Sequence, residues 1–220
     1  MSRLVTIIPA SGSGQRFGSS VPKQLYHIDD EVILEKTHRI FDIEIIDKIY
    51  IAVNQKILKT LLPLKKNFCS KSEFVLSGDK TRALTVLNTL KQISNDLDEN
   101  DWIIVHDAVR PYLSSSQLSN FIAKTLKTNH GSIMAFPCVD TVKEVNDSMQ
   151  IISTIDRSKI WLAQTPQMFP YKILHEALDN FPGNPTDESQ ALEYAGYKPI
   201  IIKGPAENIK ITFQEDLKTS

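Results

Sequence analysis

The sequence contains very little cysteine. Cys69 and Cys138 are the only two in 220 residues, and they lie far apart in no Cys-x-x-Cys pattern. This spacing argues against a disulfide framework or a zinc site and suits a reducing compartment. The five histidines show no metal-binding spacing either. We therefore expect the fold to depend on its apolar core.

The sequence also lacks a long apolar run and an excess of charge of either sign. The N-terminal run Leu4–Ile8 ends at Pro9, which makes it shorter than a signal-peptide core, and no segment approaches the roughly 20 apolar residues of a membrane span. The 25 Lys and Arg residues balance 26 Asp and Glu residues, so the formal charge is −1. A general nucleic-acid-binding surface is not expected from this balance. We expect a cytoplasmic protein that binds neither membranes nor nucleic acid.

What the chain does contain is an alternation of strand and helix patterns without repeats, low-complexity tracts or linkers. The length suits one large α/β domain over residues 1–220. Expected strands are Leu4–Ile8, Lys48–Val53, Glu73–Leu76, Trp102–Val105, Ser132–Phe136, Trp161–Phe169 and Pro199–Ile202. Expected helices are Val32–Phe41, Thr81–Ile93, Ser116–Leu126, Tyr171–Leu178 and a segment from Thr186 through Tyr194, with a final helix starting at Gln214.

A glycine-rich stretch follows the first buried strand. It runs from Pro9 to Gly18, contains Gly12 and Gly14, and leads to Pro22-Lys23-Gln24. Glycines let the backbone bring bare N–H groups up to a ligand, and successive N–H groups form a concavity that suits phosphate oxygens. Arg16 and Lys23 add positive charge beside it. The alternative is a tight strand-to-helix turn with solvent-facing basic residues.

Spacing excludes two familiar phosphate loops. A P-loop needs a Gly-Lys-Ser/Thr group four residues after its first glycine, and the stretch has none. A dinucleotide fingerprint needs a third glycine where Phe17 stands and an acidic residue where Asn54 ends the second strand. We therefore expect a different kind of nucleotide loop.

Two further groups of polar residues accompany the buried elements. Asp107 follows the fourth strand, at the sheet edge where open α/β sheets bind ligands, and is a candidate Mg²⁺ ligand or nucleotide contact. Alternatively it caps the following turn and pairs with Arg110. We expect His106 to be a packed, hydrogen-bonded residue. Arg82 and Thr85 occupy the first turns of a helix, where anions are favoured, although Arg82 could also be a solvated surface charge.

Acidic residues open another helix at Thr186-Asp187-Glu188. Acidic side chains in a first turn interact favourably with the helix dipole, and Thr186 or Asp187 is a suitable N-cap. For Asp187 and Glu188 this structural role is the favoured interpretation.

A hairpin interrupts the α/β alternation. Thr141–Val145 and Gln150–Thr154 flank the turn Asn146-Asp147-Ser148. An isolated hairpin buries little surface, so it must pack on something. A second copy of the chain is the natural partner. The alternative is an excursion that lies on its own domain.

The motifs resemble those of a known family. Gly12-Ser13-Gly14-Gln15-Arg16 followed by Pro22-Lys23-Gln24 looks like the signature of nucleotidyltransferases that activate sugar or polyol phosphates. Later motifs narrow the resemblance to the 2-C-methyl-D-erythritol 4-phosphate cytidylyltransferase family, and they follow its order along nearly the whole chain. They are Gly78-Asp79 with Arg82 and Thr85, His106–Pro111, Asp140–Lys143, Asp156-Arg157, Thr165–Gln167, Thr186–Glu188 and Asn208–Lys210. Each motif is weak alone, and together they are highly specific.

The resemblance implies a fold, a reaction and partners. The fold is a Rossmann-like three-layer α/β sandwich with a mainly parallel central sheet and a protruding β-arm, at about residues 138–160, for dimerisation. The reaction transfers CMP from CTP, accompanied by Mg²⁺, to a small polyol phosphate in non-mevalonate isoprenoid precursor synthesis. Pyrophosphate is the leaving group. The chain is expected to form a homodimer.

The resemblance also implies roles for residues. Catalytic residues are Arg16 and Lys23, which stabilise the pentavalent transition state, and Arg157 and Lys210, which bind the acceptor phosphate. The implied nucleotide-binding residues are Ala10, Ser11, Gly12, Gly14, Gly78, Asp79, Arg82, Thr85 and Asp107. The implied acceptor-binding residues are Asp107, Arg110, Thr141, Arg157, Thr165 and Lys210. Ser11 stands where relatives commonly have a second alanine.

Two other functions remain open at this point. The first is transfer to another acceptor, since ribitol 5-phosphate cytidylyltransferases share several of these motifs. Ala191–Tyr194 and Asn208–Lys210 look more like the methylerythritol phosphate enzymes. The second is a non-catalytic nucleotide-binding module, which would usually have lost the lysines that are present here as Lys23 and Lys210.

Overall fold

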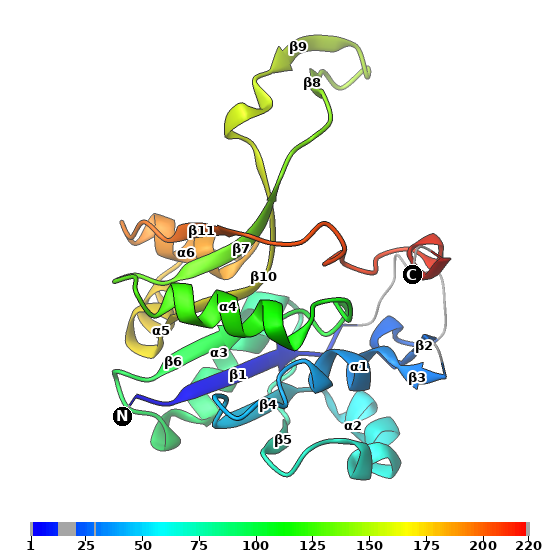
Figure 1. Cartoon of the computed structure of the whole chain (residues 1–220), viewed down its shortest axis with the longest axis vertical. Coiled ribbons are helices and arrows are strands. Elements are labelled where there is room, and N and C mark those ends of the chain that lie inside the picture. The colour runs from blue at the N-terminus through cyan, green and yellow to red at the C-terminus, as the bar shows by residue number, and fades with distance from the viewer. Residues whose placement is uncertain (1, 13–20, 29, 219–220) are drawn as a thin grey trace.

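The computed structural model describes residues 2–12, 21–28 and 30–218 and is built on a seven-stranded sheet (Figure 1). The strand order is β11-β7-β10-β6-β1-β4-β5. The strands are β1 (Leu4–Pro9), β4 (Lys48–Ala52), β5 (Ser72–Val75), β6 (Trp102–Val105), β7 (Ser132–Pro137), β10 (Trp161–Pro170) and β11 (Ile200–Lys203). Neighbouring strands are parallel except at β10, which runs antiparallel to β6 and β7. The predicted mainly parallel sheet is confirmed.

Helices cover both faces of this sheet. Alternate side chains of β1 enter two separate cores, because successive residues of a strand point to opposite faces. Leu4 and Ile8 pack with one set of helices, and Val5 and Ile7 pack with the other. The first set is α1 (Ile33–Arg39), α2 (Gln55–Leu61) and α4 (Ser115–Thr125), and the second is α3 (Arg82–Gln92), α5 (Tyr171–Asp179) and α6 (Glu188–Tyr194). The predicted three-layer α/β architecture is confirmed.

Polar side chains fix where the helices begin. Thr81 caps α3 by accepting from the N–H of Leu84, and Ser114 caps α4 in a capping box with Gln117. Asp187 caps α6 by accepting from the N–H of Gln190. Each cap satisfies an N–H that has no partner inside its helix. The helix starts therefore follow from local side-chain chemistry and lie close to the predicted positions.

The order of the strands locates the ligand-binding edge. From β1 the chain moves outward to β4 and β5, and then returns to place β6 on the other side of β1. The carboxyl ends of these parallel strands share one edge, and ligands of open α/β sheets bind where the strand order reverses. That point lies between β1 and β6. Ala10, which follows β1, and Asp107, which follows β6, lie at that point.

Short elements near this edge were not predicted from the sequence. A 3-10 helix at Lys23–Leu25 leads into β2 (His27–Ile28) and β3 (Glu31–Val32), which pair antiparallel. These strands are too short for apolar and polar residues to alternate visibly in the sequence. A 3-10 helix (Leu62–Asn67) extends α2, and the expected final helix is a single 3-10 stretch, Gln214–Lys218.

The hairpin stands off the body of the protein (Figure 1). Its strands β8 (Val142–Val145) and β9 (Ile151–Ile155) form a separate two-stranded sheet. Ile151 is 65% exposed and Ile152 is 61% exposed, which is unusual for side chains of this type. The hairpin therefore does not lie on its own domain, and that alternative is wrong.

None of the helices in the described ranges is long and apolar enough to cross a membrane.

A buried histidine supports one edge of the core. His38 of α1 is 2% exposed, and its Nε2 lies 2.7 Å from the Ser72 hydroxyl and 3.3 Å from the Cys69 sulfur. Its ring also packs against Phe68, with centroids 4.9 Å apart. Burial disfavours the charged ring and lowers the pKa of His38 to about 4 from its ordinary 6.5. The native protein thus holds this histidine neutral.

Stability should fall in mild acid because of this histidine. Below its unfolded pKa of 6.5 the unfolded chain binds a proton that the native state refuses until its own pKa of about 4. The free energy of unfolding should therefore drop by about 2 kcal/mol per such histidine between about pH 7.5 and about pH 5. Urea denaturation at both pH values, compared with His38→Gln, measures this loss. Parallel pH curves for the two proteins would contradict the assignment.

Candidate active site

The first half of the site is the loop that leaves β1. The N–H of Ala10 donates to the carbonyl of Ala52 at 2.8 Å, which extends the sheet by one residue. Asn54 donates through Nδ2 to the carbonyl of Ser11 at 2.9 Å, and Gln24 donates through Nε2 to the carbonyls of Ala10 and Gly12 at 2.8 and 2.9 Å. In the described part of this loop, the carbonyls of Ala10, Ser11 and Gly12 thus all accept hydrogen bonds.

Residues from the loop after β5 pack directly on this stretch. A Cβ atom at Gly78 would lie 2.5 Å from Cβ of Ser11 and 2.8 Å from the backbone nitrogen of Asn54, so only glycine permits the approach. The hydroxyls of Ser11 and Thr85 are 3.0 Å apart, and the N–H of Asp79 donates to the Thr85 hydroxyl at 3.0 Å. The structure therefore brings together Ser11, Gly78, Asp79 and Thr85. Gly14 and Arg16 lie outside the described residues.

Lys23 connects this loop to the C-terminal segment. Its Nζ donates to the carbonyl of Ile211 at 3.0 Å. Ile211 is held in turn by its own N–H, which donates to the carbonyl of Val109 at 3.0 Å. Because Lys210 immediately precedes Ile211, this contact brings the two predicted catalytic lysines to the same region.

The second half of the site is centred on the carboxylate of Asp107, which is 5% exposed. Oδ1 accepts from Nε of Arg82 at 2.7 Å, and Oδ2 lies 2.8 Å from Nζ of Lys210. Oδ2 also accepts from Nε of Arg110 at 3.4 Å. The three cations come from three distant segments of the chain, so one carboxylate fixes them relative to one another.

Neighbouring groups hold this cluster in place. The N–H of Asp107 donates to the Thr165 hydroxyl at 3.0 Å, and Arg110 donates through Nη1 to the carbonyl of Asn208 at 2.7 Å. Asn208 donates through Nδ2 to the carbonyl of Thr165 at 2.8 Å. The fully buried His106 lies 3.1 Å from the carbonyl of Arg110 through Nε2, and burial lowers its pKa to about 4. His106 is thus a packed, hydrogen-bonded residue, as predicted.

Arg82 has a second carboxylate partner behind the cluster. Its Nη1 donates to both oxygens of Glu188, at 2.6 and 2.8 Å, and Glu188 is fully buried. Burial disfavours the cation, but Glu188 and Asp107 outweigh it and raise the pKa of Arg82 above its ordinary value. Burial alone would raise the pKa of Asp107, but Arg82, Lys210 and Arg110 hold it well below its usual range. Asp107 therefore remains charged.

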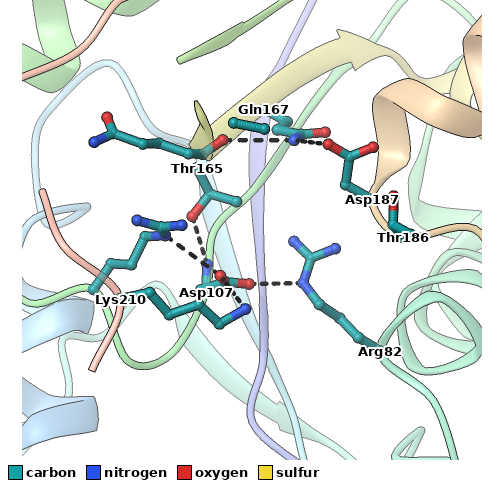
Figure 2. Close-up of a pocket in the computed structure, with 10 residues that line it drawn as sticks. Arg82, Asp107, Thr165, Gln167, Thr186, Asp187 and Lys210 are labelled. Atoms are coloured by element: carbon teal, nitrogen blue, oxygen red, sulfur yellow. Dashed lines mark hydrogen bonds and ion pairs between the residues drawn. The ribbon is translucent and has the colours of Figure 1, made fainter. Parts of the chain in front are cut away.

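A cavity of about 210 Å³ opens beside this cluster (Figure 2). It is smaller than the roughly 300–1,000 Å³ of most ligand pockets, and suits a small polar molecule better than a whole nucleoside triphosphate. The lining residues are Arg82, Asp107, Arg110, Ala163, Gln164, Thr165, Gln167, Thr186, Asp187 and Lys210. The predicted acceptor-binding residues Asp107, Arg110, Thr165 and Lys210 all belong to this set.

Three further predicted residues lie at the rim of the site or outside it. The guanidinium of Arg82 lies between Asp107 and Glu188 beside the cavity, so Arg82 is not the solvated surface charge that was the alternative. Its contact with a nucleotide stays a prediction. Thr141 and Arg157 are exposed on the arm and do not line the cavity of their own chain. The Arg157 guanidinium donates instead to the carbonyl of Val139.

The carboxylate predicted as a Mg²⁺ ligand, that of Asp107, is paired with cations in this structure. Both oxygens already accept from cations, and a metal ion there would displace Lys210 and lie among positive charges. Among the described residues no group of three or more His, Cys, Asp or Glu side chains could hold a metal ion. The structure thus shows Asp107 holding the cations, and its metal role stays a prediction.

Several supporting residues were not predicted as members of the site. Gln24, Asn54, Gln167, Asp187, Glu188 and Asn208 hold loops or line the cavity. Most of them lie within the quoted motifs, but the motif does not tell which side chain faces the cavity. Asn54 follows a buried strand, as Asp107 does, and that position was the one available signal.

Comparisons with known proteins all identify the same family, and they cover nearly the whole chain. The family model described as 2-C-methyl-D-erythritol 4-phosphate cytidylyltransferase matches residues 4–220. Curated proteins of that name are similar, from Actinobacillus pleuropneumoniae (40% identical, 98% of this chain, 93% of the relative) and Acinetobacter baumannii (35%, 99% and 92%). A solved Francisella tularensis structure of that name has a TM-score of 0.81 at 32% identity, covering 99% of this chain and 97% of the relative. A solved 4-diphosphocytidyl-2C-methyl-D-erythritol synthase reaches a TM-score of 0.84 at 32% identity, covering 99% and 96%.

Removing the charge of Glu188 should destabilise the protein. Glu188→Gln leaves the half-buried Arg82 with only part of its compensation, and loss of one partner of a buried ion pair typically costs about 3 kcal/mol or more. The free energy of unfolding from urea denaturation measures the loss. Glu193→Gln, on the exposed side of the same helix, is the matched control and should stay within about 0.5 kcal/mol of the original chain. Equal stability of the two variants would show that the pair contributes nothing.

Proposed function

The chain belongs to the 2-C-methyl-D-erythritol 4-phosphate cytidylyltransferase family, and we propose that it transfers CMP from CTP to 2-C-methyl-D-erythritol 4-phosphate. The products are 4-diphosphocytidyl-2-C-methyl-D-erythritol and pyrophosphate. The observation that carries this proposal is the cluster of Arg82, Arg110 and Lys210 around Asp107, beside the loop that follows β1. It provides cations at the point where the strand order of the sheet reverses.

The reaction explains why cations are needed. An oxygen of the acceptor phosphate attacks the α-phosphorus of CTP, a new P–O bond forms, and the bond to the β-phosphate oxygen breaks. Both reactants are anions that repel each other, so cations must hold them together and stabilise the charge that develops. No side-chain nucleophile or change of oxidation state is required.

The residues divide into two groups in this proposal. Ala10, Ser11, Gly78, Asp79 and Thr85 bind the cytidine, whose pyrimidine suits a slot closed by direct contact of these loops. Lys23, together with Arg16, stabilises the triphosphate and the pentavalent α-phosphorus. Arg110 and Lys210 bind the acceptor phosphate, with Lys210 moving from Asp107 onto a phosphate oxygen. The contact between Lys23 and Ile211 supports this arrangement, because it ties the two groups together.

A divalent cation is part of the proposal as a companion of CTP. Mg²⁺ usually keeps several waters and binds phosphate oxygens in such sites. We therefore assign it to the triphosphate and give it no side chain of the cluster. A cytoplasmic location stays a prediction from the sequence.

The arm supports a homodimer in which each chain completes the site of the other. Arg157 and Thr141 are exposed and lie apart from the cavity of their own chain. The exposed apolar side chains of the arm, such as Ile151 and Ile152, need a partner surface. In a two-fold dimer the arm of one chain would bring Arg157 to the acceptor phosphate of the other.

The proposed function is tested by pyrophosphate release from CTP. We expect turnover with 2-C-methyl-D-erythritol 4-phosphate and much less with ribitol 5-phosphate. We also expect CTP to be preferred over ATP and GTP, because a pocket that hydrogen-bonds one base edge leaves polar groups unpaired with another. Preference for ribitol 5-phosphate would favour the related family instead, and binding of CTP without turnover would favour a non-catalytic module.

Mixed dimers test the sharing of sites between chains. Arg157→Ala and Lys210→Ala should each abolish most activity, because each removes a cation from both sites of the dimer. When the two variants are co-expressed with different tags, each mixed dimer has one site that keeps both residues. Random pairing in an equal mixture makes half of the dimers mixed, so about a quarter of the original activity should be recovered. Activity no higher than that of the separate variants would mean that Arg157 serves its own chain.

A further inference from the structure

The cavity is polar at both ends, with opposite charge. Lys210 and Asp107 lie at one end, beside Thr165, and Asp187 lies at the other, with the guanidinium of Arg82 between Asp107 and Asp187 (Figure 2). Lys210 and Arg110 contribute positive charge to the first end, whereas the charge of Asp187 is compensated by no cation among its hydrogen-bond partners in the described ranges. A molecule in this cavity therefore meets positive charge on one side and a carboxylate on the other.

The Asp187 carboxylate is fixed, and one of its acceptor positions is left over. Oδ1 accepts from the N–H of Gln190 at 2.9 Å and from the Ser189 hydroxyl at 3.0 Å. Oδ2 accepts from Nε2 of Gln167 at 2.9 Å. A carboxylate offers about four acceptor positions, so Oδ2 keeps one. Because Gln167 also lines the cavity, the oxygen that keeps this position is at the cavity wall.

Gln167 cannot turn to take that position. It is 1% exposed, and its Oε1 accepts from the N–H of Ser189 at 3.1 Å, which fixes its amide with Nε2 toward Asp187. The carboxylate is thus oriented by its neighbours before any ligand binds. A fixed acceptor of this kind suits a hydroxyl donor and repels a phosphate.

We propose that Asp187 is a specificity residue that accepts a hydrogen bond from the acceptor hydroxyl farthest from the phosphate. This inference rests on the proposed function and deepens it. The phosphate lies at the Lys210 end, where it meets the cations, and the polyol chain extends toward Asp187. In 2-C-methyl-D-erythritol 4-phosphate the farthest hydroxyl is the one on C1. Asp187 then favours acceptors whose chain length and hydroxyl pattern reach it.

The experiment removes each partner of this hydrogen bond in turn. Asp187→Ser keeps a good N-cap for α6 but removes Oδ2, and Asp187→Asn keeps Oδ1 but replaces Oδ2 with a donor. Each variant is assayed with the full acceptor and with the analogue that lacks the C1 hydroxyl. Glu193→Ser, exposed near the end of the same helix, controls for general weakening of α6.

We expect both Asp187 variants to lower kcat/KM for the full acceptor by about 10- to 100-fold, mainly through acceptor KM, because hydrogen bonds to charged groups have this strength. The KM for CTP should change less than about twofold. With the C1-deoxy acceptor, the original chain and the variants should be alike. Equal losses on both acceptors would show a structural role and overturn the inference. Unchanged kinetics of the Asp187 variants with the full acceptor would also overturn the inference. If the original chain is itself inactive with the full acceptor, the proposed function is overturned as well.

Discussion

The site depends on one buried carboxylate that holds three cations together. Arg82, Arg110 and Lys210 would repel one another if Asp107 did not lie between them. Glu188 compensates one more charge from behind, which leaves one positive charge in excess. In the proposed reaction the acceptor phosphate meets Arg110 already in position, and Lys210 needs only to turn from Asp107 onto a phosphate oxygen. Asp107 thus fixes the cations relative to one another.

The fold explains how such distant residues meet. Arg82 begins a helix, Arg110 follows the end of β6, and Lys210 lies in the segment after β11. Parallel strands bring their carboxyl ends to one edge, and the reversal of strand order at β1 and β6 leaves a crevice between the connecting loops. The backbone contact between Ile211 and Val109 then ties the last segment to that crevice.

Much of this could be predicted from the sequence because it follows from local patterns. Apolar runs mark the buried strands, and Asp107 directly follows one of them, so its position at the ligand-binding edge follows from α/β topology. Gly78 is also explained, since a side chain there would collide with Ser11. The short strands β2 and β3 could not be predicted, because two residues show no periodicity. The role of Asp107 as a holder of cations depends on long-range contacts that no local pattern encodes.

Asp187 and Glu188 show most clearly where sequence patterns stop being informative. Both open the same helix, and the same composition rule assigns both to the helix dipole. In the folded chain Glu188 turns inward to Arg82, whereas Asp187 caps the helix and meets the cavity through Oδ2. Gln167 of β10 donates to Oδ2 of Asp187, and the Arg82 guanidinium donates to Glu188, so the two neighbours are held by different partners. The antiparallel strand β10 therefore helps to fix the carboxylate of Asp187, a hydrogen-bond acceptor, in the cavity that the cations also line. This opposition of charge is the basis for the proposed direction of the acceptor in the cavity.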